Sequence, residues 1–324
     1  MSEMRWGIIG TGGIARTFAR DLKRTSGQSV VAVGSRSKEK AEAFASEFDC
    51  RPHASYESLV QSDVDAIYVA TPHPMHAPNT ILALQHGKPV LCEKPFAVNA
   101  RESASMIAEA KKSNLLLLEA MWSRFLPHYR RIREMIAAGD FGEIISISAD
   151  HGQNLPLPKY YRLHAPELAG GALLDLGIYP LSFAYFVLGK PQSVVAKGEF
   201  TETGVDSQTS MILRYDSGAH ANLTTTLLVK SPCTATIVGT QGTLFIDGDF
   251  YTPTSMRFKK VSGEILEIPK SYEGHGLREQ AIEFEQLLRA GKKESELMSL
   301  SDTQSIMETM DEIRAQINLK YPFE

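Results

Sequence analysis

Three glycines near the N-terminus have the spacing of a dinucleotide-binding turn. They stand in the run GTGGIA, residues 10–15, after the apolar run RWGIIG and before the helical pattern IARTFARDLKR. In a G-x-G-x-x-A turn the first glycine allows a tight bend, the second lets backbone approach a pyrophosphate, and the alanine allows close helix–strand packing. The helix N-terminus would face the anion. We predict a dinucleotide site with contacts from Gly10, Thr11, Gly12, Gly13 and Ile14; the alternative is a chance glycine turn.

The residues after the second expected strand distinguish NAD(H) from NADP(H). An NAD site usually has Asp or Glu there, to bind the ribose hydroxyls. This chain has Ser35, Arg36 and Ser37, followed by Lys38 and Lys40. Guanidinium and hydroxyl donors suit a 2′-phosphate, and Arg36 can also stack on the adenine. We predict NADP(H) in preference to NAD(H), with Ser35, Arg36 and Lys40 in contact with it. Alternatively SRSKEK is a capped, solvated helix start with Ser37 as N-cap, and both interpretations can hold together.

A lysine ends an apolar run that resembles an interior strand. The residues PVLC lead into Glu93 and Lys94, and Pro95 then stops the strand. An unpaired ammonium is costly to bury. Ligands of open α/β sheets lie outside the carboxyl ends of the strands. We therefore expect Lys94 in the cofactor crevice, facing a nicotinamide ribose or a substrate oxygen; the alternative is a lysine in water or paired with Glu93.

A doubly wound parallel sheet would bring these residues together. Up to residue 120 short apolar runs alternate with helical patterns, which is typical of βαβ units. We expect strands at 5–10, 30–35, 65–71, 89–94 and 115–120, and helices at 14–24, 37–48, 77–87 and 99–113. Val, Ile and Leu on both faces of the strands indicate helices on both sides of the sheet. The fold class is thus α/β, with an NADP-binding Rossmann domain predicted over residues 1–121.

The remainder, residues 122–324, is predicted to be an α+β substrate-binding and dimerisation domain with a large, mainly antiparallel sheet. Strand-like runs without intervening helices favour hairpins; they lie at 143–152, 193–202, 207–218, 219–229, 233–247, 256–263 and 264–269. Helical patterns at 277–291 and 301–317 close the chain. A large open sheet needs cover, so we expect a homodimer or higher homo-oligomer through this sheet, unless helices cover it.

Composition excludes several classes of function. The 324 residues are 43% hydrophobic and 22% charged, as in soluble globular proteins, and the net charge of −4 comes without a basic or acidic block. Neither nucleic-acid nor membrane binding therefore has electrostatic support. The start lacks a signal-peptide pattern, and no run approaches the roughly 20 apolar residues of a membrane span. Three scattered cysteines and the histidines lack metal-ligand spacing, so we predict no metal and, by default, a cytoplasmic location.

Several motifs together resemble the Gfo/Idh/MocA family of oxidoreductases across the whole chain. These are the glycine turn, Thr71-Pro72-His73-Pro74-Met75-His76 after the third strand, Glu93-Lys94-Pro95 after the fourth, and GTQGTL at 239–244. The stretches EAMWSRFLP (119–127) and GGALLDLGIYP (170–180) resemble the branch that holds dimeric dihydrodiol dehydrogenase and NADP-dependent D-xylose dehydrogenase. That branch has D-x-x-x-Y where many members of the family have D-x-x-x-H.

The resemblance implies NADP-dependent hydride transfer at a carbinol or carbonyl carbon of a sugar, diol or small dicarbonyl. It also implies cofactor contacts from Thr71, Pro72, His73, His76, Glu93, Lys94, Trp122 and Arg124. For His76 a structural cap is at least as good an explanation. Trp122 and Arg124 can equally be packing at the domain junction.

Asp175 and Tyr179, four residues apart, would share one face of a helix that begins after Gly170 and Gly171. An unperturbed tyrosine titrates at about pH 10, and a nearby ammonium favours its phenolate. We predict Tyr179 as acid and base, Lys94 as the group that stabilises the alkoxide, and Asp175 as an orienting residue or a ligand of a substrate hydroxyl. The alternative is a tyrosine that only packs in the helix core.

Weaker predictions complete the site. His151, Asn154, Trp122 and Asp175 are predicted substrate contacts, although lone His and Asn residues usually serve structure. The segment 155–171 is predicted to be a mobile lid or else a fixed loop. Other functions stay open: a regulatory sensor that binds NAD(P) without turnover, a dehydrogenase of inositol or another polyol, and an imine or biliverdin-type reduction.

Overall fold

The computed structural model describes residues 3–324 and divides the chain into two compact units. Unit 1 comprises Met1–Phe125 and Gly274–Gln304, and unit 2 comprises Leu126–Glu273 and Ser305–Glu324. The sequence predicted a single domain boundary, after residue 121. In the structure the chain leaves unit 1 after Phe125 and returns to it for one further segment.

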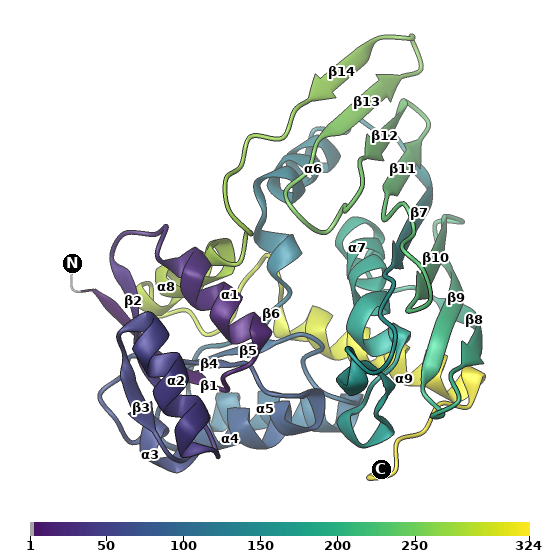
Figure 1. The fold of residues 1–324 in the computed structure, drawn as a ribbon. Helices are drawn as coiled ribbons and strands as arrows, with labels where there is room; N and C mark the ends of the chain where they lie inside the picture. Colours follow the sequence, from purple (N-terminus) through teal and green to yellow (C-terminus); the bar gives the residue numbers. More distant parts are fainter. Residues whose placement is uncertain (1–2) are drawn as a thin grey trace. The chain divides into compact units, whose positions relative to one another are not determined.

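Unit 1 is built on a six-stranded parallel sheet in the order β3-β2-β1-β4-β5-β6 (Figure 1). Its strands are β1 (Met4–Ile9), β2 (Gln28–Gly34), β3 (Arg51–His53), β4 (Ala66–Val69), β5 (Val90–Glu93) and β6 (Leu117–Ala120). This confirms the predicted Rossmann fold, in which all five expected strands are present. The extra strand β3 was missed because its three residues, Arg-Pro-His, contain no apolar run.

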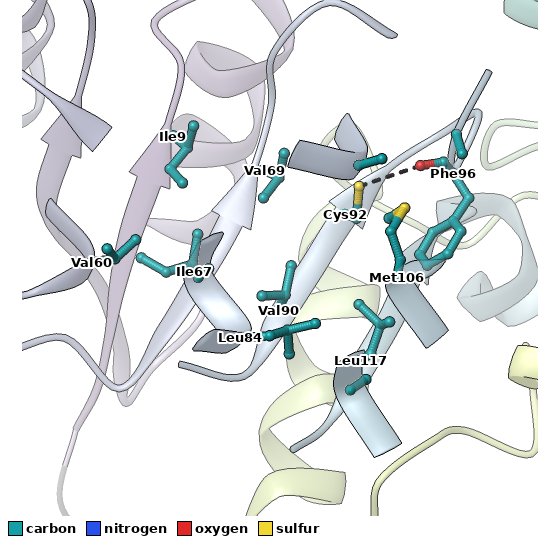
Figure 2. Close-up of a cluster of buried hydrophobic side chains, with 14 of the residues drawn as sticks. Ile9, Val60, Ile67, Val69, Leu84, Val90, Cys92, Phe96, Met106 and Leu117 are labelled. Carbon is teal, nitrogen blue, oxygen red and sulfur yellow. Dashed lines mark hydrogen bonds between the residues drawn. The ribbon is translucent and has the colours of Figure 1, made fainter. Parts of the chain in front are cut away.

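Helices cover both faces of this sheet, as its apolar strands require. The helices of unit 1 are α1 (Gly13–Leu22), α2 (Lys38–Phe48), α3 (Tyr56–Val60), α4 (His76–Gln85), α5 (Ala100–Ser113), α8 (Arg278–Arg289) and the first residues of α9 (Leu300–Ile317). On one face Val90 and Cys92 of the sheet pack with Leu84 of α4 and Met106 of α5 (Figure 2). On the other face Trp6 lies against Phe18 of α1 and Phe284 of α8, with ring centroids 5.6 and 5.0 Å away.

A buried carboxylate ties the returning segment to unit 1. Asp21 of α1 accepts hydrogen bonds from the backbone N–H groups of His275, Gly276 and Arg278, at 3.1, 3.0 and 2.9 Å. These N–H groups belong to the start of α8, where a helix has unsatisfied donors and favours negative charge. Asp21 therefore caps α8 from a helix more than 250 residues earlier in the chain. No local sequence signal marks such a distant cap.

Unit 2 contains an eight-stranded sheet in the order β14-β13-β12-β11-β7-β10-β9-β8. Its strands are β7 (Ile144–Gly152), β8 (Ser193–Phe200), β9 (Asp206–Arg214), β10 (His220–Thr226), β11 (Ala235–Gly239), β12 (Gly242–Ile246), β13 (Met256–Lys260) and β14 (Ile265–Ile268). The predicted large, mainly antiparallel sheet is confirmed. The run 233–247 is a hairpin of two strands. Strands β7 and β10 pair in parallel, and the chain between them contains a helix and the strands β8 and β9.

Two further helices of unit 2 are α6 (Pro127–Ala137), which was not predicted, and α7 (Ile178–Leu188), which lies in the helix expected after Gly170 and Gly171. Helix α7 is apolar on all sides and packs on β7 and β10. Within residues 3–324 one stretch, Pro166–Leu188, is long and apolar enough to cross a membrane, but 83% of its most apolar window is buried in the protein. Its hydropathy is that of a core helix in a globular unit.

Candidate active site

One group of candidate functional residues lies at the carboxyl edge of the parallel sheet in unit 1. Strands β1, β2, β4, β5 and β6 all end at this edge, because neighbouring strands run in the same direction. The structure thereby gathers the predicted cofactor residues of unit 1 at one edge: Gly10–Ile14, Ser35, Arg36, Lys40, Thr71–His73, His76, Glu93, Lys94, Trp122 and Arg124. This is the region where ligands of open α/β sheets bind.

The glycine turn has two kinds of glycine. Gly10 has φ +112°, and a Cβ atom there would lie 2.5 Å from the carbonyl oxygen of Ala70, so only glycine fits. A Cβ at Gly12 or Gly13 would meet no protein atom within 4 Å. Protein packing therefore does not require glycine at either position, and the space above Gly12 is the place where the motif lets backbone approach a pyrophosphate. The N-terminus of α1 has no side-chain cap and no acidic residue in its first turn, which leaves its N–H groups suited to an anion.

The turn after β2 is held by serines and exposes Arg36. The Ser35 hydroxyl accepts a hydrogen bond from the Ser37 N–H at 3.2 Å, and the Ser37 hydroxyl accepts one from the Lys40 N–H at 3.2 Å. Ser37 is thus the N-cap of α2, which confirms that part of the sequence interpretation. The rigid turn leaves the Arg36 side chain in solvent at the carboxyl edge.

His76 lies between the residues that follow β4 and those that follow β5. Its Nδ1 lies 2.8 Å from the carbonyl oxygen of Pro95, and its Nε2 lies 2.8 Å from that of Thr71. Burial, with the nearby His73 and Lys94, lowers the pKa of His76 to about 3, so the ring is neutral and donates to one carbonyl. The structural role that the sequence left open for His76 is therefore present. Thr71 is held further by the Asn79 amide, which donates to its hydroxyl at 3.2 Å.

Glu93 and Lys94 end β5 in different environments. Glu93 is buried and accepts hydrogen bonds from the Tyr68 hydroxyl and, at 3.2 Å, from the Lys94 backbone N–H. Lys94 is half-buried and is followed by a cis peptide bond to Pro95. The sequence analysis placed Lys94 at this edge but did not identify Tyr68, because a tyrosine in an apolar strand has the pattern of a core residue.

The turn after β6 is braced by the returning segment. Trp122 and Arg124 are buried; the Trp122 ring lies 4.9 Å from that of His275, and Arg124 Nη1 lies 3.6 Å from Asp302 Oδ2. Glu119, one residue before the end of β6, accepts a hydrogen bond from the Thr303 hydroxyl at 2.8 Å. Burial raises the pKa of Glu119 to about 7, although Thr303 and Arg124 oppose the shift.

A separate group of candidate functional residues lies in unit 2, on the helix that carries Asp175 and Tyr179. The helix begins after Gly171, which has φ +115° and packs so closely on Asp206 that a Cβ would lie 2.1 Å from Asp206 Oδ1. The buried Asp206 carboxylate accepts hydrogen bonds from the Leu173 N–H at 2.8 Å and the Thr209 hydroxyl at 2.9 Å. Burial raises the pKa of Asp206 to about 6. The residues Leu173–Gly177 then form one π-helical turn before α7. Such turns are rare and are frequent at functional sites.

Tyr179 is packed in an aromatic cluster. Its ring lies 5.2 Å from that of His151 and 4.8 Å from that of Tyr251, and the side chain is 6% exposed. His151 and Tyr251 stack at 4.0 Å, and Gln153 donates to the Tyr251 hydroxyl at 2.8 Å. The structure therefore brings the predicted residues His151 and Tyr179 together. Tyr251 was missed, because it follows β12 in a turn-rich segment with no chemical motif.

Asp175 is paired with a residue of the segment 155–171. Arg162 Nη2 donates to Asp175 Oδ1 at 3.0 Å. The same segment is held by His164, which lies 2.8 Å from the Leu155 carbonyl oxygen, and by Leu163, which is buried. These contacts favour the fixed loop over the mobile lid. Asn154, in contrast, is exposed just before this segment.

Residues 3–324 contain no group of three or more His, Cys, Asp or Glu side chains arranged to hold a metal ion. The polar side chains described above have other partners: His76 lies beside backbone carbonyl oxygens, Glu119 accepts from a hydroxyl, and Asp175 is paired with Arg162.

Comparison with protein families gives two matches. Residues 4–120 match the model described as oxidoreductase family, NAD-binding Rossmann fold, and residues 129–245 match the GFO/IDH/MocA C-terminal domain. The first stretch contains the glycine turn, Arg36 and Lys94, and the second contains Asp175 and Tyr179.

Similar proteins cover nearly the whole chain. The trans-1,2-dihydrobenzene-1,2-diol dehydrogenase of Xenopus tropicalis is 38% identical over 98% of this chain and 99% of its own length. The D-xylose 1-dehydrogenase (NADP(+)) of Hypocrea jecorina is 35% identical over 98% and 93%. The 3-ketoreductase KijD10 of Actinomadura kijaniata, solved with NADP and TDP-benzene, has a TM-score of 0.86 and 27% identity over 98% of each chain.

The buried Glu119 predicts a pH dependence of stability. Its pKa of about 7 in the folded protein lies above the ordinary glutamate value of 4.5. The Glu119 carboxyl therefore stays protonated to a higher pH in the folded state than in the unfolded state. The stability that the protonated carboxyl contributes is fully present below pH 4.5 and is lost as the pH rises through 7. Glu119→Gln keeps an acceptor for Thr303 and cannot ionise. We expect its free energy of unfolding, from urea denaturation, to fall less than that of the wild type between pH 5 and 8, by about 2–3 kcal/mol. Parallel pH curves for the two proteins would contradict this.

Proposed function

Because the chain belongs to the Gfo/Idh/MocA family of oxidoreductases, we propose that it transfers hydride between NADP(H) and a carbinol or carbonyl carbon of a sugar, diol or small dicarbonyl. The observation that carries the proposal is the pair of functional residues Lys94 and Tyr179. Lys94 stands at the carboxyl edge that holds the glycine turn, and Tyr179 stands on a helix fixed by a buried carboxylate and a π turn. The names of the relatives, a diol dehydrogenase and a D-xylose dehydrogenase, support this substrate class.

The proposed cofactor preference rests on the residues after β2. Ser35 and the solvent-exposed Arg36 present donors where an NAD site places a carboxylate. The open space above Gly12 and Gly13 supports the proposal, because a Cβ there would meet no protein atom within 4 Å. The NADP(+) in the name of one relative and the NADP bound to KijD10 point in the same direction. Residues Gly10–Ile14, Thr71–His73, His76, Glu93, Lys94, Trp122 and Arg124 would complete the cofactor site.

In the proposed mechanism the chain moves a proton and stabilises a charge, and the bound nicotinamide accepts or returns the hydride. During oxidation Tyr179 takes the proton of the substrate hydroxyl as the C–H hydride leaves the same carbon. The Lys94 ammonium stabilises the developing alkoxide and favours the phenolate form of tyrosine. During reduction Tyr179 returns the proton to the oxygen. Asp175, whose carboxylate accepts a hydrogen bond from Arg162, orients the Tyr179 phenol or binds a second substrate hydroxyl.

The surroundings of Tyr179 suit this role. His151 and Tyr251 cover its ring and limit the access of water to the phenol. A sensor that binds NAD(P) without turnover would need the carboxyl edge of unit 1 but not this cluster in unit 2. The presence of both favours the enzyme over the sensor.

We extend the proposal to a homodimer through the outer face of the unit 2 sheet. On this face Val195 of β8 is paired with Ile212 of β9, and the two are 62% and 51% exposed. Exposed apolar residues on a wide open sheet are typical of an interface between copies. We expect light scattering to give twice the mass of one chain for the wild type and the mass of one chain for Ile212→Arg. A monomeric wild type would refute the dimer. A cytoplasmic location, also proposed, is tested by fractionation of the source cells.

Arg36→Ala tests the cofactor preference. Loss of the guanidinium removes charge-assisted hydrogen bonds to a 2′-phosphate, so the dissociation constant of NADP(H) should rise about tenfold to a hundredfold, with that of NAD(H) unchanged. Isothermal titration calorimetry with both nucleotides measures this. The matched control is Lys38→Ala, which removes an exposed cation two residues later. The preference fails if Arg36→Ala leaves NADP(H) binding unchanged, or if Lys38→Ala has the same effect.

Tyr179→Phe tests the catalytic role while the ring keeps its packing on His151 and Tyr251. The wild type is first assayed by nicotinamide absorbance, in both directions, against D-xylose and other aldoses, trans-dihydrodiols, inositol and dicarbonyls. With the substrate that is turned over, Tyr179→Phe should lower kcat about a hundredfold or more. Nucleotide affinity should stay unchanged. Near-full turnover by the variant would remove Tyr179 from the mechanism, and nucleotide binding without any turnover by the wild type would favour the sensor.

A further inference from the structure

Tyr68 is a polar residue in the most buried part of unit 1. It lies in β4, one of the central strands, within the sequence Ala66-Ile67-Tyr68-Val69, and its side chain is 0% exposed. A phenol in such a place needs a hydrogen-bond partner, because leaving its hydroxyl unsatisfied away from water is costly. Phenylalanine would fill the same space without this requirement. The hydroxyl therefore calls for a specific explanation.

The partner of this hydroxyl is the residue that precedes Lys94. The Tyr68 hydroxyl donates to Glu93 Oε1, while Glu93 Oε2 accepts the backbone N–H of Lys94 at 3.2 Å. One buried carboxylate thus bridges the phenol of β4 and the main chain of Lys94. The backbone at Lys94 is fixed through Glu93 by a side chain from the neighbouring strand.

The Tyr68 ring cannot easily move away from this position. Phe18 of α1 stacks on it with ring centroids 4.0 Å apart and an interplanar angle of 22°. Phe18 in turn packs on Trp6 of β1 at 5.6 Å. Helix α1 is the helix that follows the glycine turn. The rings therefore connect the element that carries the glycine turn to the residue that orients Glu93.

Stability alone does not account for a buried phenol and carboxylate. Burying a carboxylate carries a desolvation cost, and apolar residues of similar volume are often as stable or more stable in such places. The pair does, however, define one orientation of the Glu93 side chain. On the other side of Lys94 the Pro95 carbonyl oxygen lies 2.8 Å from His76 Nδ1, so the buried His76 ring packs directly against this turn.

We infer that Tyr68 is a positioning residue, whose hydroxyl fixes the Glu93 carboxylate and through it the placement of Lys94 at the carboxyl edge of the sheet. This inference rests on the proposed function for the catalytic consequence of moving Lys94. The placement itself is a property of unit 1 alone and can be measured without any substrate.

Tyr68→Phe tests the inference, because it removes one oxygen and keeps the ring on Phe18. The matched control is Tyr215→Phe: the Tyr215 side chain is also buried, and its hydroxyl has no hydrogen-bond partner within residues 3–324. Near-ultraviolet circular dichroism and thermal unfolding verify that both variants fold. Glu93→Gln is a second variant, in which the amide nitrogen cannot accept the Lys94 N–H.

The first measurement follows the environment of Lys94 directly. Lysines are reductively methylated with ¹³C-formaldehyde, and the Lys94 signal is identified by its absence in Lys94→Arg. We expect Tyr68→Phe and Glu93→Gln to shift the Lys94 resonance and Tyr215→Phe to leave it in place. An unmoved Lys94 signal in folded Tyr68→Phe overturns the inference, whatever the enzyme does with substrate.

The second measurement is a double-mutant cycle of turnover with Tyr68→Phe and Lys94→Ala, on the substrate found with the wild type. Tyr68→Phe should lower kcat about tenfold to a hundredfold with little change in KM, since small misplacements of a catalytic group have effects of this size. In the Lys94→Ala background the same change should have almost no further effect. A full, additive effect of Tyr68→Phe in that background overturns the inference. If Lys94→Ala itself keeps near-full turnover, the proposed function of Lys94 fails, while the shift of the Lys94 signal still decides the placement.

Discussion

The structure of unit 1 depends on one constraint: polar groups at the carboxyl edge of a sheet that is buried on both faces must find partners inside the protein. Tyr68 with Glu93 and Glu119 with Thr303 meet this constraint through side chains. His76 lies between two backbone carbonyl oxygens and donates to one of them. These inner contacts fix the strand ends. The groups that point outward from the same edge, among them the glycine turn and Arg36, can then be held in place without moving the core.

Unit 2 solves a similar problem at a helix rather than at a sheet edge. Asp206, the first residue of β9, caps the helix entry, and Gly171 is required because Asp206 approaches its backbone so closely. The π turn that follows carries Asp175, whose carboxylate is bound by Arg162. Gly171 therefore serves the close approach of a buried carboxylate, whereas a Cβ at Gly170 would lie 2.6 Å from the Leu163 carbonyl oxygen.

The sequence predicted regular features and missed those that depend on distant partners. The five expected strands of unit 1 were found because their apolar runs are continuous, and Ser37 was identified as a cap because its partner is three residues away. The cap of α8 by Asp21, the ring of Tyr251 on Tyr179 and the bond from Tyr68 to Glu93 join residues far apart in sequence. No spacing rule connects such pairs. The π turn was missed for a different reason: its residues have the same apolar pattern as an ordinary helix.

The return of the chain to unit 1 has a consequence for biosynthesis. Phe284 and the start of α8 cover Trp6 and bind Asp21, so the core of the first unit is incomplete until these late residues are available. On the ribosome the first 125 residues emerge long before these late residues. Until then the ring of Trp6 and the carboxylate of Asp21 lack the partners that α8 provides in the folded protein. Domains generally fold in the order of their synthesis. Here the core of unit 1 can be completed only after residues 274–304 have been synthesised.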